Sequence, residues 1–395
     1  MRIGIDGSRA FLKNRTGIEE YSYQIIKNLR NELSSFDVIL YVRKYQKKLK
    51  CEEAKPPMGG LASGELGFEL PENWKVKIIK WPFFWTQAGL SLEMLFHPVD
   101  ALFVPAHTVP LIHPVRTIVT VHGLEYEFCP SAYSFWERFY MRISIKNSCR
   151  WASGIISVSE NTKKDLMKLY GVAENKIKVI YEGCNNNFEF RISNFESNQN
   201  DKNSKIKTLE FHSKFKIQNS KFLLFLGRIE ERKNIGNIVK AFEILKEKYK
   251  IQHKLVLAGK PGYGWENIKA QITNSKNKNE ILELGFVSEE EKWELLKNAE
   301  VFVFPTQYEG FGIPILEAQS VGCPVVASNN SSIVEVADGS ALLVDPQSPA
   351  EISEAIYKII SNQPFKKDLI EKGLENVQRF SWEKCAREVR AILMK

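Results

Sequence analysis

Residues 302–328 read FVFPTQYEGFGIPILEAQSVGCPVVAS, and the order of residue types in this stretch decides the fold. It opens within an apolar run, Val301–Phe304, of the kind that forms a buried parallel strand. A glycine-rich loop follows, and Pro314 suits the first turn of a helix because the N–H that proline lacks would have no partner there. Gly322 favours a left-handed helix end, and Val325–Ala327 has the composition of the next strand. The stretch therefore predicts a right-handed βαβ unit.

The loop of this unit has the features of an anion site. Gly310 and Gly312 let backbone N–H groups approach a ligand closely, and the following helix directs the positive end of its dipole to the same place. We therefore expect a phosphate group there. The carboxylates of Glu309 and Glu317 border this position, and they bind phosphate poorly but accept hydrogen bonds from sugar hydroxyls. An anion with hydroxyls on both sides describes a nucleotide-sugar.

The motif E-G-F-G-x-P-x-L-E, which has seven residues between its glutamates, resembles the signature of GT4-type retaining glycosyltransferases of GT-B fold. A structural βαβ unit with an incidental pair of glutamates is the alternative. Several further segments resemble the same family in the same order, over nearly the whole chain. The resemblance implies an α/β protein with two Rossmann-like domains that face each other across a cleft, and a C-terminal helix that crosses back to the first domain.

The length of 395 residues suits two domains better than one, and the 44% hydrophobic and 26% charged content is that of a globular protein. By resemblance, residues 1–190 should form an N-terminal acceptor domain, and residues 217–378 a C-terminal nucleotide-sugar donor domain. The segment 191–216 is rich in Asn, Ser and Lys, which predicts a polar linker or insertion. We expect residues 379–395 to form the helix that returns to the N-terminal domain.

Composition argues against several classes of protein. The net charge of +8 is moderate for this length, and no dense Lys/Arg tract or recognition motif supports nucleic-acid binding. The six cysteines are scattered without a CxxC pair, which favours reduced thiols in a cytosolic protein. Met1 leads directly into a predicted strand, so we expect no signal peptide. No apolar run reaches the roughly 18 residues of a membrane helix. We therefore expect a cytoplasmic protein whose only membrane contact is peripheral, at the inner face of the cell membrane.

A second candidate for phosphate chemistry follows the predicted strand Phe222–Leu226. Gly227 and Arg228 stand at the end of this strand, and Lys233 follows five residues later. Two cations at a strand end can neutralise a diphosphate as its bond to a sugar breaks, whereas a surface ion pair is the alternative. The spacing resembles the G-R-x-x-x-x-K pattern of GT4-type enzymes, which implies that Arg228 and Lys233 act on the diphosphate.

Two positions in the first half resemble donor-contacting positions of the family. Gly17 opens a helix behind a capping box between Thr16 and Glu19, and the resemblance places it near the donor diphosphate; an ordinary βα turn fits its local sequence equally well. His122 follows a β-branched strand, and the resemblance places it beside the donor sugar. The family usually has aspartate where this chain has Gly123, and a lone histidine is more often structural than catalytic.

The resemblance assigns a role to each of the remaining residues. Glu309 should hold the sugar hydroxyls, Glu317 the ribose, and Val287 the nucleotide base, mostly through its backbone. The predicted catalytic residues are His122, Arg228, Lys233 and Glu309, and the predicted donor-binding residues are Gly17, Val287, Gly310, Phe311, Gly312 and Glu317. No nucleophile is evident, which is consistent with a same-face mechanism in which the leaving phosphate helps to deprotonate the acceptor. The sequence has no Asp-x-Asp and no cluster with metal-ligand spacing, so we expect no metal and no other cofactor.

The predicted helix 135–151 carries a row of basic residues beside apolar and aromatic ones. The basic residues are spaced four apart: Arg138, Arg142, Lys146 and Arg150. A solvated charged face is the simpler interpretation. The alternative is an interface for anionic lipid headgroups or for a pyrophosphate-linked acceptor.

Together these observations predict a retaining, metal-independent hexosyltransferase of surface polysaccharide synthesis, with a nucleotide-diphosphate sugar as donor and a glycan or lipid-linked acceptor. GDP-mannose is favoured because residues 16–18 and 104–107 resemble bacterial mannosyl-type enzymes, and UDP-sugars come next. A nucleotide-sugar epimerase or a phosphorylase would share much of the scaffold. A nucleotide-sugar sensor and a nucleic-acid-binding protein are the alternatives that are not enzymes.

Overall fold

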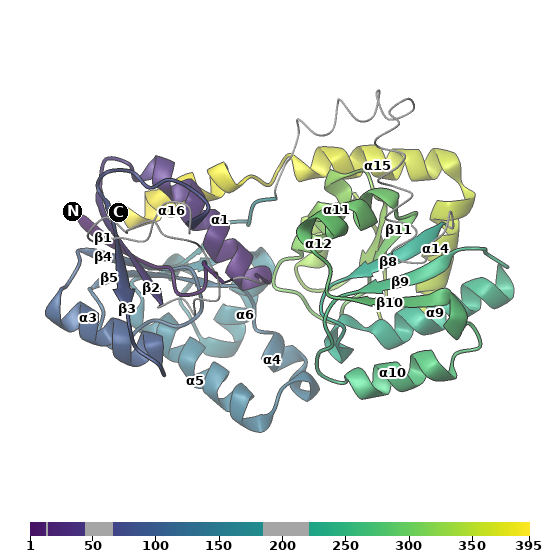
Figure 1. The fold of residues 1–395 in the computed structure, drawn as a ribbon, viewed down its shortest axis with the longest axis horizontal. Coiled ribbons are helices and arrows are strands. Elements are labelled where there is room, and N and C mark those ends of the chain that lie inside the picture. Colours follow the sequence, from purple (N-terminus) through teal and green to yellow (C-terminus); the bar gives the residue numbers. More distant parts are fainter. Residues whose placement is uncertain (13–14, 44–65, 185–220) are drawn as a thin grey trace, which may run out of the picture. The chain divides into compact units, whose positions relative to one another are not determined.

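The structure is a computed structural model that describes residues 1–12, 15–43, 66–184 and 221–395, so the predicted linker 191–216 lies outside the described residues. The chain divides into two compact units (Figure 1). Unit 1 comprises Met1–Leu124, Phe135–Gly183 and Ser381–Lys395, and unit 2 comprises Glu125–Ser134 and Cys184–Phe380. Each unit is built around its own parallel sheet, as expected for Rossmann-like domains.

Unit 1 contains a seven-stranded sheet in the order β3-β2-β1-β4-β5-β6-β7, with every neighbouring pair parallel. The strands are β1 (Arg2–Asp6), β2 (Asp37–Arg43), β3 (Trp74–Ile79), β4 (Ala101–Val104), β5 (Arg116–Val121), β6 (Gly154–Ser157) and β7 (Ile177–Val179). Most residues of β1, β4, β5 and β6 are buried, because a parallel sheet is covered on both faces.

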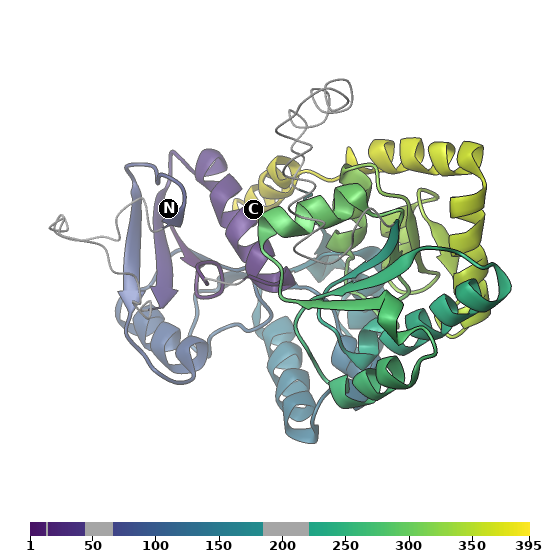
Figure 2. The ribbon, with the colours of Figure 1, turned by 45° about the vertical axis from the view of Figure 1, so that its right-hand side comes forward.

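The principal helices of unit 1 are α1 (Gly17–Glu32), α3 (Ser91–Phe96), α5 (Phe135–Trp151), α6 (Glu160–Tyr170) and α16 (Trp382–Leu393). The capping box predicted at the start of α1 is present. Helix α16, the last of the chain, lies beside α1 in unit 1, as both ribbon views show (Figures 1 and 2). Its buried face, which includes Trp382, Val389 and Leu393, joins the same core as Tyr21 and Ile25 of α1. The predicted return of the C-terminal helix to the first domain is therefore confirmed.

Unit 2 contains a six-stranded parallel sheet in the order β10-β9-β8-β11-β12-β13. The strands are β8 (Phe222–Leu226), β9 (Lys254–Ala258), β10 (Ile281–Gly285), β11 (Val301–Phe304), β12 (Val325–Ser328) and β13 (Leu342–Val344). The helices are α4 (Glu125–Phe128), α9 (Ile235–Lys248), α10 (Trp265–Asn274), α11 (Glu289–Asn298), α12 (Ile313–Ser320), α13 (Ile333–Ala337), α14 (Pro349–Ser361) and α15 (Gln363–Val377).

The βαβ unit predicted from residues 302–328 is confirmed. Strand β11 pairs in parallel with β12, and α12 forms the connection between them. Gly322 follows the end of α12 with a φ of 75°, the left-handed conformation that glycine adopts without strain. The backbone N–H of Cys323 then bonds to the carbonyl of Ala318, which closes the helix end before Pro324 starts the next extended segment.

Both sheets have a point where the strand order reverses: between β1 and β4 in unit 1, and between β8 and β11 in unit 2. In open parallel sheets, ligands bind outside the carboxyl ends of the strands at this point. The loops after β8 and β11 are therefore the first place to search for a ligand site in unit 2. The loops after β1, β4 and β5 are the equivalent place in unit 1.

One short segment is assigned to the other unit than its neighbours in sequence. Residues 125–134, which include α4, belong to unit 2, although the chain before and after them belongs to unit 1. The pattern of apolar residues in the sequence does not predict this assignment. The assignment depends on contacts between residues far apart in the chain, such as Cys129 and Gln307, which are 178 positions apart.

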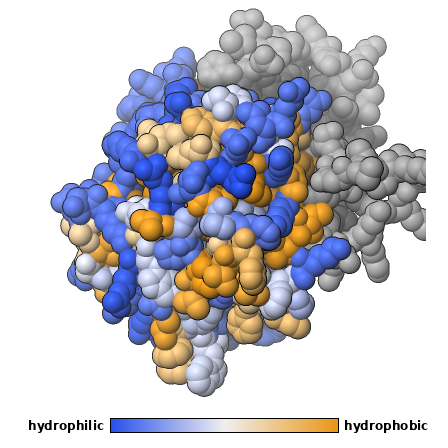
Figure 3. All heavy atoms as spheres, turned by 90° about the vertical axis from the view of Figure 1, so that its left-hand side faces the viewer, coloured by the Kyte–Doolittle hydropathy of each residue, from blue (hydrophilic) through white to orange (hydrophobic). Residues whose placement is uncertain are grey.

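The surface of unit 1 exposes several large apolar side chains. Phe83, Phe84, Phe96, Phe135 and Trp136 are each between 70% and 74% exposed. Figure 3 shows apolar patches among hydrophilic side chains on the face at the left of Figure 1, which belongs to unit 1. Among the described residues, no helix combines the length and the hydrophobicity needed to cross a membrane.

Candidate functional site

A cluster of buried charges lies at the strand ends of unit 2. Glu309 stands in the loop after β11, and Lys233 closes the short 3₁₀ helix Glu231–Lys233 in the connection after β8. Because β8 and β11 are adjacent parallel strands, the two connections meet at the same edge of the sheet. The Nζ of Lys233 donates to Oε1 of Glu309 at 2.6 Å, and both side chains are only 11% exposed.

Arg232 joins the same cluster, and the sequence reasoning missed it. Its Nη1 lies 3.3 Å from Oε1 of Glu309 and donates to the carbonyl oxygen of Tyr308 at 2.9 Å. Its Nη2 donates to Oε1 of Glu230 at 2.9 Å. The side chain of Arg232 is 12% exposed. Its neighbour Lys233 was the only signal in the sequence, since nothing local distinguishes Arg232 from a solvated arginine.

Burial and the neighbouring charges have opposing effects on the pKa values of these groups. Burial by itself raises the pKa of Glu309, but Lys233 and Arg232 together outweigh it, so the pKa lies below its ordinary value and the carboxylate is ionised. Burial lowers the pKa of Lys233, and the Arg232 charge adds to this effect, although Glu309 opposes it. For Arg232, burial is outweighed by the surrounding carboxylates, and its pKa is raised. The guanidinium is therefore the permanent charge of the cluster.

Arg228, at the end of β8, differs from the other two cations. Its side chain is 67% exposed, and its Nε lies 3.7 Å from Oε2 of Glu230. The preceding Gly227 has a φ of 147°, and its carbonyl oxygen would lie 1.7 Å from a Cβ at Gly259. The two loops therefore approach each other so closely at this edge that Gly259 tolerates no side chain.

The glycine-rich turn after Glu309 is fixed by a second loop that sequence reasoning also missed. Ser332 Oγ donates to the carbonyl oxygens of both Glu309 and Phe311, at 2.9 and 2.7 Å. Ser331 Oγ accepts the N–H of Glu309 at 3.1 Å. Gly312, the N-cap of α12, has a φ of 121°, where any other residue would be strained. Residues 331–332 therefore hold the turn from its outer side.

The side chain of Phe311 is buried against an aromatic neighbour in unit 2. It is only 4% exposed, and its ring meets that of Phe380 at 5.7 Å in an edge-on arrangement. Gly310 and Gly312 flank it and start α12 with backbone N–H groups at the strand-end edge. Phe311 thus anchors the turn, and any contact that it makes with a ligand comes from its backbone.

Glu317 and Val287 lie further along the same edge. Lys292 of α11 donates to Oε1 of Glu317 at 2.8 Å, and both side chains are 13–14% exposed. Burial would lower the pKa of Lys292, but the carboxylates of Glu317 and Glu289 outweigh it and raise the pKa. Val287 is partly buried against the core of unit 2. Lys292 is a further residue that the sequence did not predict.

The segment 125–134 contacts the loop that carries Glu309. The ring of Phe128 stacks on that of Tyr308, with centroids 4.5 Å apart and planes 9° apart. The thiol of Cys129 lies 3.8 Å from Oε1 of Gln307. Burial raises the pKa of Glu125, although the charge of Arg232 opposes this effect. Residues 307 and 308 are therefore held between this segment on one side and Arg232 on the other.

In unit 1, His122 lies in a buried polar cluster. Its Nδ1 is 3.0 Å from Oε1 of Glu182, its Nε2 is 2.9 Å from the carbonyl oxygen of Pro105, and it is 7% exposed. A backbone carbonyl can only accept, so Nε2 carries a proton. Both ring nitrogens are thus engaged by the protein itself. Glu182, which partners His122 across 60 residues of sequence, was not predicted.

A second histidine lies next to His122. The Nδ1 of His107, in the loop after β4, accepts the backbone N–H of His122 at 3.4 Å, and the two rings are 5.3 Å apart. Burial lowers the pKa of His107 well below its ordinary value, and the charge of His122 adds to this effect. His107 is therefore neutral, with its proton on Nε2, and can donate a hydrogen bond from there.

Gly17 is the first residue of α1 and follows the N-cap Thr16. A Cβ built at Gly17 would meet no atom within 4 Å, so packing in unit 1 does not require glycine there. The described residues contain no group of three His, Cys, Asp or Glu side chains arranged to hold a metal ion. Gly17 and His122 belong to unit 1, whereas the other predicted site residues belong to unit 2.

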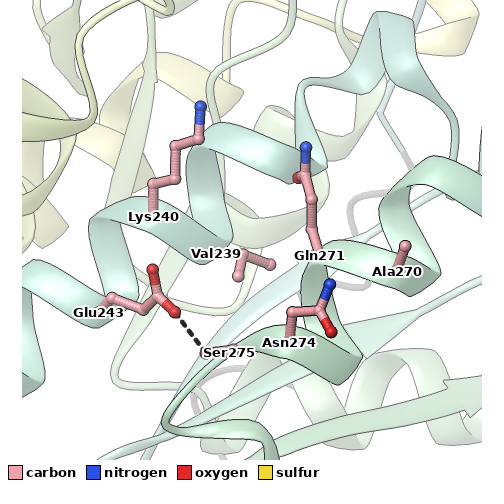
Figure 4. Close-up of a pocket in the computed structure, with 7 residues that line it drawn as sticks. All are labelled: Val239, Lys240, Glu243, Ala270, Gln271, Asn274 and Ser275. Atoms are coloured by element: carbon pink, nitrogen blue, oxygen red, sulfur yellow. Dashed lines mark hydrogen bonds between the residues drawn. The ribbon is translucent and has the colours of Figure 1, made fainter.

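A pocket of about 310 Å³ lies elsewhere in unit 2, between α9 and α10 (Figure 4). Its lining residues are Val239, Lys240, Glu243, Ala270, Gln271, Asn274 and Ser275. The hydroxyl of Ser275 donates to Glu243 at 2.6 Å within it. None of the predicted site residues lines this pocket, so it is distinct from the strand-end cluster.

Comparison with known proteins defines the class to which this chain belongs. The family described as "Glycosyl transferases group 1" matches residues 207–376, and the family described as "Glycosyltransferase Family 4" matches residues 15–188. Among solved structures, the Anabaena Alr3699/HepE protein in complex with UDP and glucose has a TM-score of 0.71 at 16% identity, with 100% of this chain and 99% of that chain covered. The lipopolysaccharide glycosyltransferase WaaG has a TM-score of 0.69 at 14% identity, with 99% of each chain covered. The chain is a GT4-type glycosyltransferase of GT-B fold.

Named relatives with similar sequences include two O-antigen enzymes. O-antigen chain mannosyltransferase B of Escherichia coli is 28% identical over 270 residues, which is 68% of each chain. O-antigen chain mannosyltransferase RfbU of Salmonella typhimurium is 24% identical over 350 residues, which is 88% of each chain.

Proposed function

We propose that this protein transfers a hexose, with retention of anomeric configuration, from a nucleoside diphosphate sugar to a glycan or lipid-linked acceptor in surface polysaccharide synthesis. The observation that carries the proposal is the strand-end cluster of unit 2, where Lys233, Arg232 and Glu309 lie beside the start of α12. A cluster of this kind offers positive charge to a diphosphate and a carboxylate to sugar hydroxyls at one position.

Each group of the cluster has a part in the proposed reaction. The exposed Arg228 and the buried Lys233 bind the diphosphate and stabilise the charge that develops as the bond to the sugar breaks. Backbone N–H groups of residues 310–312 add to the same field from the start of α12. Glu309 accepts hydrogen bonds from sugar hydroxyls, and Glu317 accepts them from the ribose. In unit 1, Gly17 admits the diphosphate and His122 borders the donor sugar.

The fixed position of Glu309 supports a same-face mechanism. Its carboxylate is held by Lys233 and Arg232, so it is stabilised as an ion in place and is a poor candidate for attack on the sugar. The leaving phosphate then remains the base that takes the acceptor proton. A proton NMR assay of the product's anomeric configuration tests this part, and inversion would contradict it.

For the sugar and nucleotide, GDP-mannose is the first choice because two of the similar proteins are named as O-antigen mannosyltransferases. The second candidate is a UDP-sugar, since the Anabaena protein with the same fold was solved with UDP-glucose. Thermal-shift measurements with GDP, UDP and dTDP distinguish these choices, because a ligand at about 100 times its Kd adds about 2.7 kcal/mol of stability.

Turnover tests the activity itself. Nucleoside diphosphate should be released from the sugar donor only when an acceptor is present. Release without an acceptor, or interconversion of the donor sugar, would favour an epimerase or another enzyme of this fold. Binding without any turnover would favour a nucleotide-sugar sensor.

We also propose that α5 contacts an anionic membrane surface where a lipid-linked acceptor is presented. Five apolar or aromatic side chains of this helix are 45–74% exposed: Phe135, Trp136, Phe139, Tyr140 and Ile143. The basic row lies on the same helix, and Arg142, Lys146 and Arg150 are exposed. Attraction to an anionic surface contributes about 1 kcal/mol per nearby basic residue, and aromatic side chains favour the headgroup region.

Sedimentation with anionic liposomes at low salt tests this contact. Changing Arg138, Arg142, Lys146 and Arg150 to Gln should reduce sedimentation and leave nucleotide binding unchanged. The matched control replaces Lys384, Arg387 and Arg390, which are exposed on α16, with Gln and should sediment as the wild type does. If the wild-type protein does not sediment with such liposomes, the basic row of α5 is only a solvated helix face.

A further inference from the structure

We propose that Arg232 is a positioning residue of the donor site, which fixes the loop 307–309 and keeps the site positive for a diphosphate. The inference rests on the proposed function, because it assigns Arg232 a part in the same donor site. It concerns a residue that occupies an unspecified position of the G-R-x-x-x-x-K pattern, directly before the lysine.

Arg232 binds three consecutive residues of the loop after β11. Its backbone carbonyl accepts the N–H of Gln307 at 3.0 Å. Its guanidinium donates to the carbonyl of Tyr308 and pairs with the carboxylate of Glu309. The planar fork of arginine can serve these acceptors at once, which a lysine ammonium group cannot do from the same place. The position of the Glu309 carboxylate is therefore set by Arg232 through both backbone and side chain.

The guanidinium also supplies one of the three positive charges of the cluster. Three cations, Arg228, Arg232 and Lys233, lie among the carboxylates of Glu230 and Glu309, and Glu125 also acts on Arg232 electrostatically. Without Arg232 only two cations remain among these carboxyl groups, so a diphosphate would meet less positive charge. Arginine keeps its charge when buried, whereas burial lowers the pKa of Lys233.

A purely structural role accounts less well for this arrangement. Desolvation makes a buried ion cluster an inefficient source of stability, and apolar replacements are often neutral or stabilising. The cluster nevertheless occupies the edge of the sheet where ligands bind in this fold class. Elsewhere in unit 2, the ion pair of Lys246, whose side chain is 9% exposed, with Glu280, which is 39% exposed, joins α9 to the segment before β10. That pair provides a matched control.

The test compares binding of a nucleoside diphosphate and the monophosphate of the same base to wild type, R232Q, R232K and K246Q. For R232Q we expect diphosphate affinity to fall about tenfold or more while monophosphate affinity falls much less, because only the diphosphate uses the lost charge. For R232K, which keeps the charge but loses the fork, we expect the affinity ratio to remain near that of wild type. Its kcat should fall about tenfold because Glu309 is no longer fixed. K246Q should match wild type in both respects.

The outcomes separate this inference from the function on which it rests. If the wild type binds no nucleoside diphosphate, the proposed function fails. If the wild type binds one but R232Q loses diphosphate and monophosphate affinity equally, Arg232 is only structural and the inference is overturned. If R232Q does not fold, R232K decides: a folded R232K with wild-type kcat overturns the inference, and a lowered kcat with an unchanged affinity ratio supports it.

Discussion

The strand ends of unit 2 and those of unit 1 present different chemistry on closely similar scaffolds. In unit 2 the buried polar groups are charged and paired with each other: Glu230, Arg232, Lys233 and Glu309. In unit 1 the polar groups around His122 are a second histidine and one carboxylate, with an aromatic neighbour: His107 and Glu182, beside Tyr21. Both groups lie in connections that follow the carboxyl ends of parallel strands.

The comparison shows that the scaffold sets the location of a site and the side chains set its ligand. The fixed cations of the cluster in unit 2 can bind the negative charges of a diphosphate. In unit 1, the neutral His107 can donate one hydrogen bond, whereas both ring nitrogens of His122 are already bonded within the protein. Variants of the charged cluster in unit 2 should therefore change the affinity for a diphosphate. Variants of the histidine cluster in unit 1 should leave that affinity unchanged.

The largest effect is expected from Lys233→Met. This change removes the buried ammonium group that lies 2.6 Å from Glu309, and breaking such a pair costs about 3–5 kcal/mol of unfolding free energy. Donor turnover should fall about 100-fold or more, because the developing charge on the diphosphate loses a fixed cation. Thermal unfolding and acceptor-dependent nucleotide release measure the two losses. Turnover at the wild-type level would show that the cluster of unit 2 is not the donor site.

His122→Ala tests the other region. The change leaves Glu182, which is 4% exposed, and the carbonyl of Pro105 without their partner, which should cost about 3 kcal/mol. Turnover should fall, but the affinity for free nucleoside diphosphate should stay within about twofold, because the cluster of unit 2 is untouched. Calorimetric titration of the variant measures this affinity. A large loss of diphosphate affinity would remove the distinction between the two regions.

Arg228→Ala and Glu317→Ala sharpen the comparison within unit 2. Replacement of the exposed Arg228 by alanine is expected to weaken nucleotide binding by about 1.5–3 kcal/mol, with little change in the stability of the fold. Glu317 pairs with Lys292 at 13–14% exposure, so its loss should weaken binding similarly and also lower stability, by less than Lys233→Met does because Lys292 keeps Glu289 as a partner. Binding is measured by titration and stability by thermal unfolding. Wild-type affinity in both variants would contradict the assignment of these residues to the donor site.

The smallest effect is expected from chelation. EDTA should leave donor turnover within about twofold, because arginine, lysine and backbone N–H groups supply the positive field at the proposed diphosphate position. The assay is the same acceptor-dependent release of nucleotide, with and without the chelator. Loss of turnover that Mn²⁺ restores would mean that the diphosphate site has been misassigned.

The sequence predicted the elements of the fold because those depend on local patterns. The strand–turn–helix–strand order around Pro314 and the capping box at Thr16 follow from the residue types themselves. The sequence did not predict Arg232, Glu182 or Ser332, since each acts through a partner 23 or more residues away in the chain. Which residues become partners depends on the register of the sheet. The local periodicity of the sequence carries no information about that register.

The central claim is that a nucleoside diphosphate binds at the strand ends of unit 2, and hydrogen exchange with and without the nucleotide tests it most directly. The backbone N–H groups of residues 227–234 and 307–317 should exchange more slowly when the nucleotide is present, because the ligand covers them and stabilises their loops. The peptides lining the pocket between α9 and α10 should not change. Protection confined to unit 1, or to that pocket, with no change in residues 227–234 and 307–317, would contradict the account.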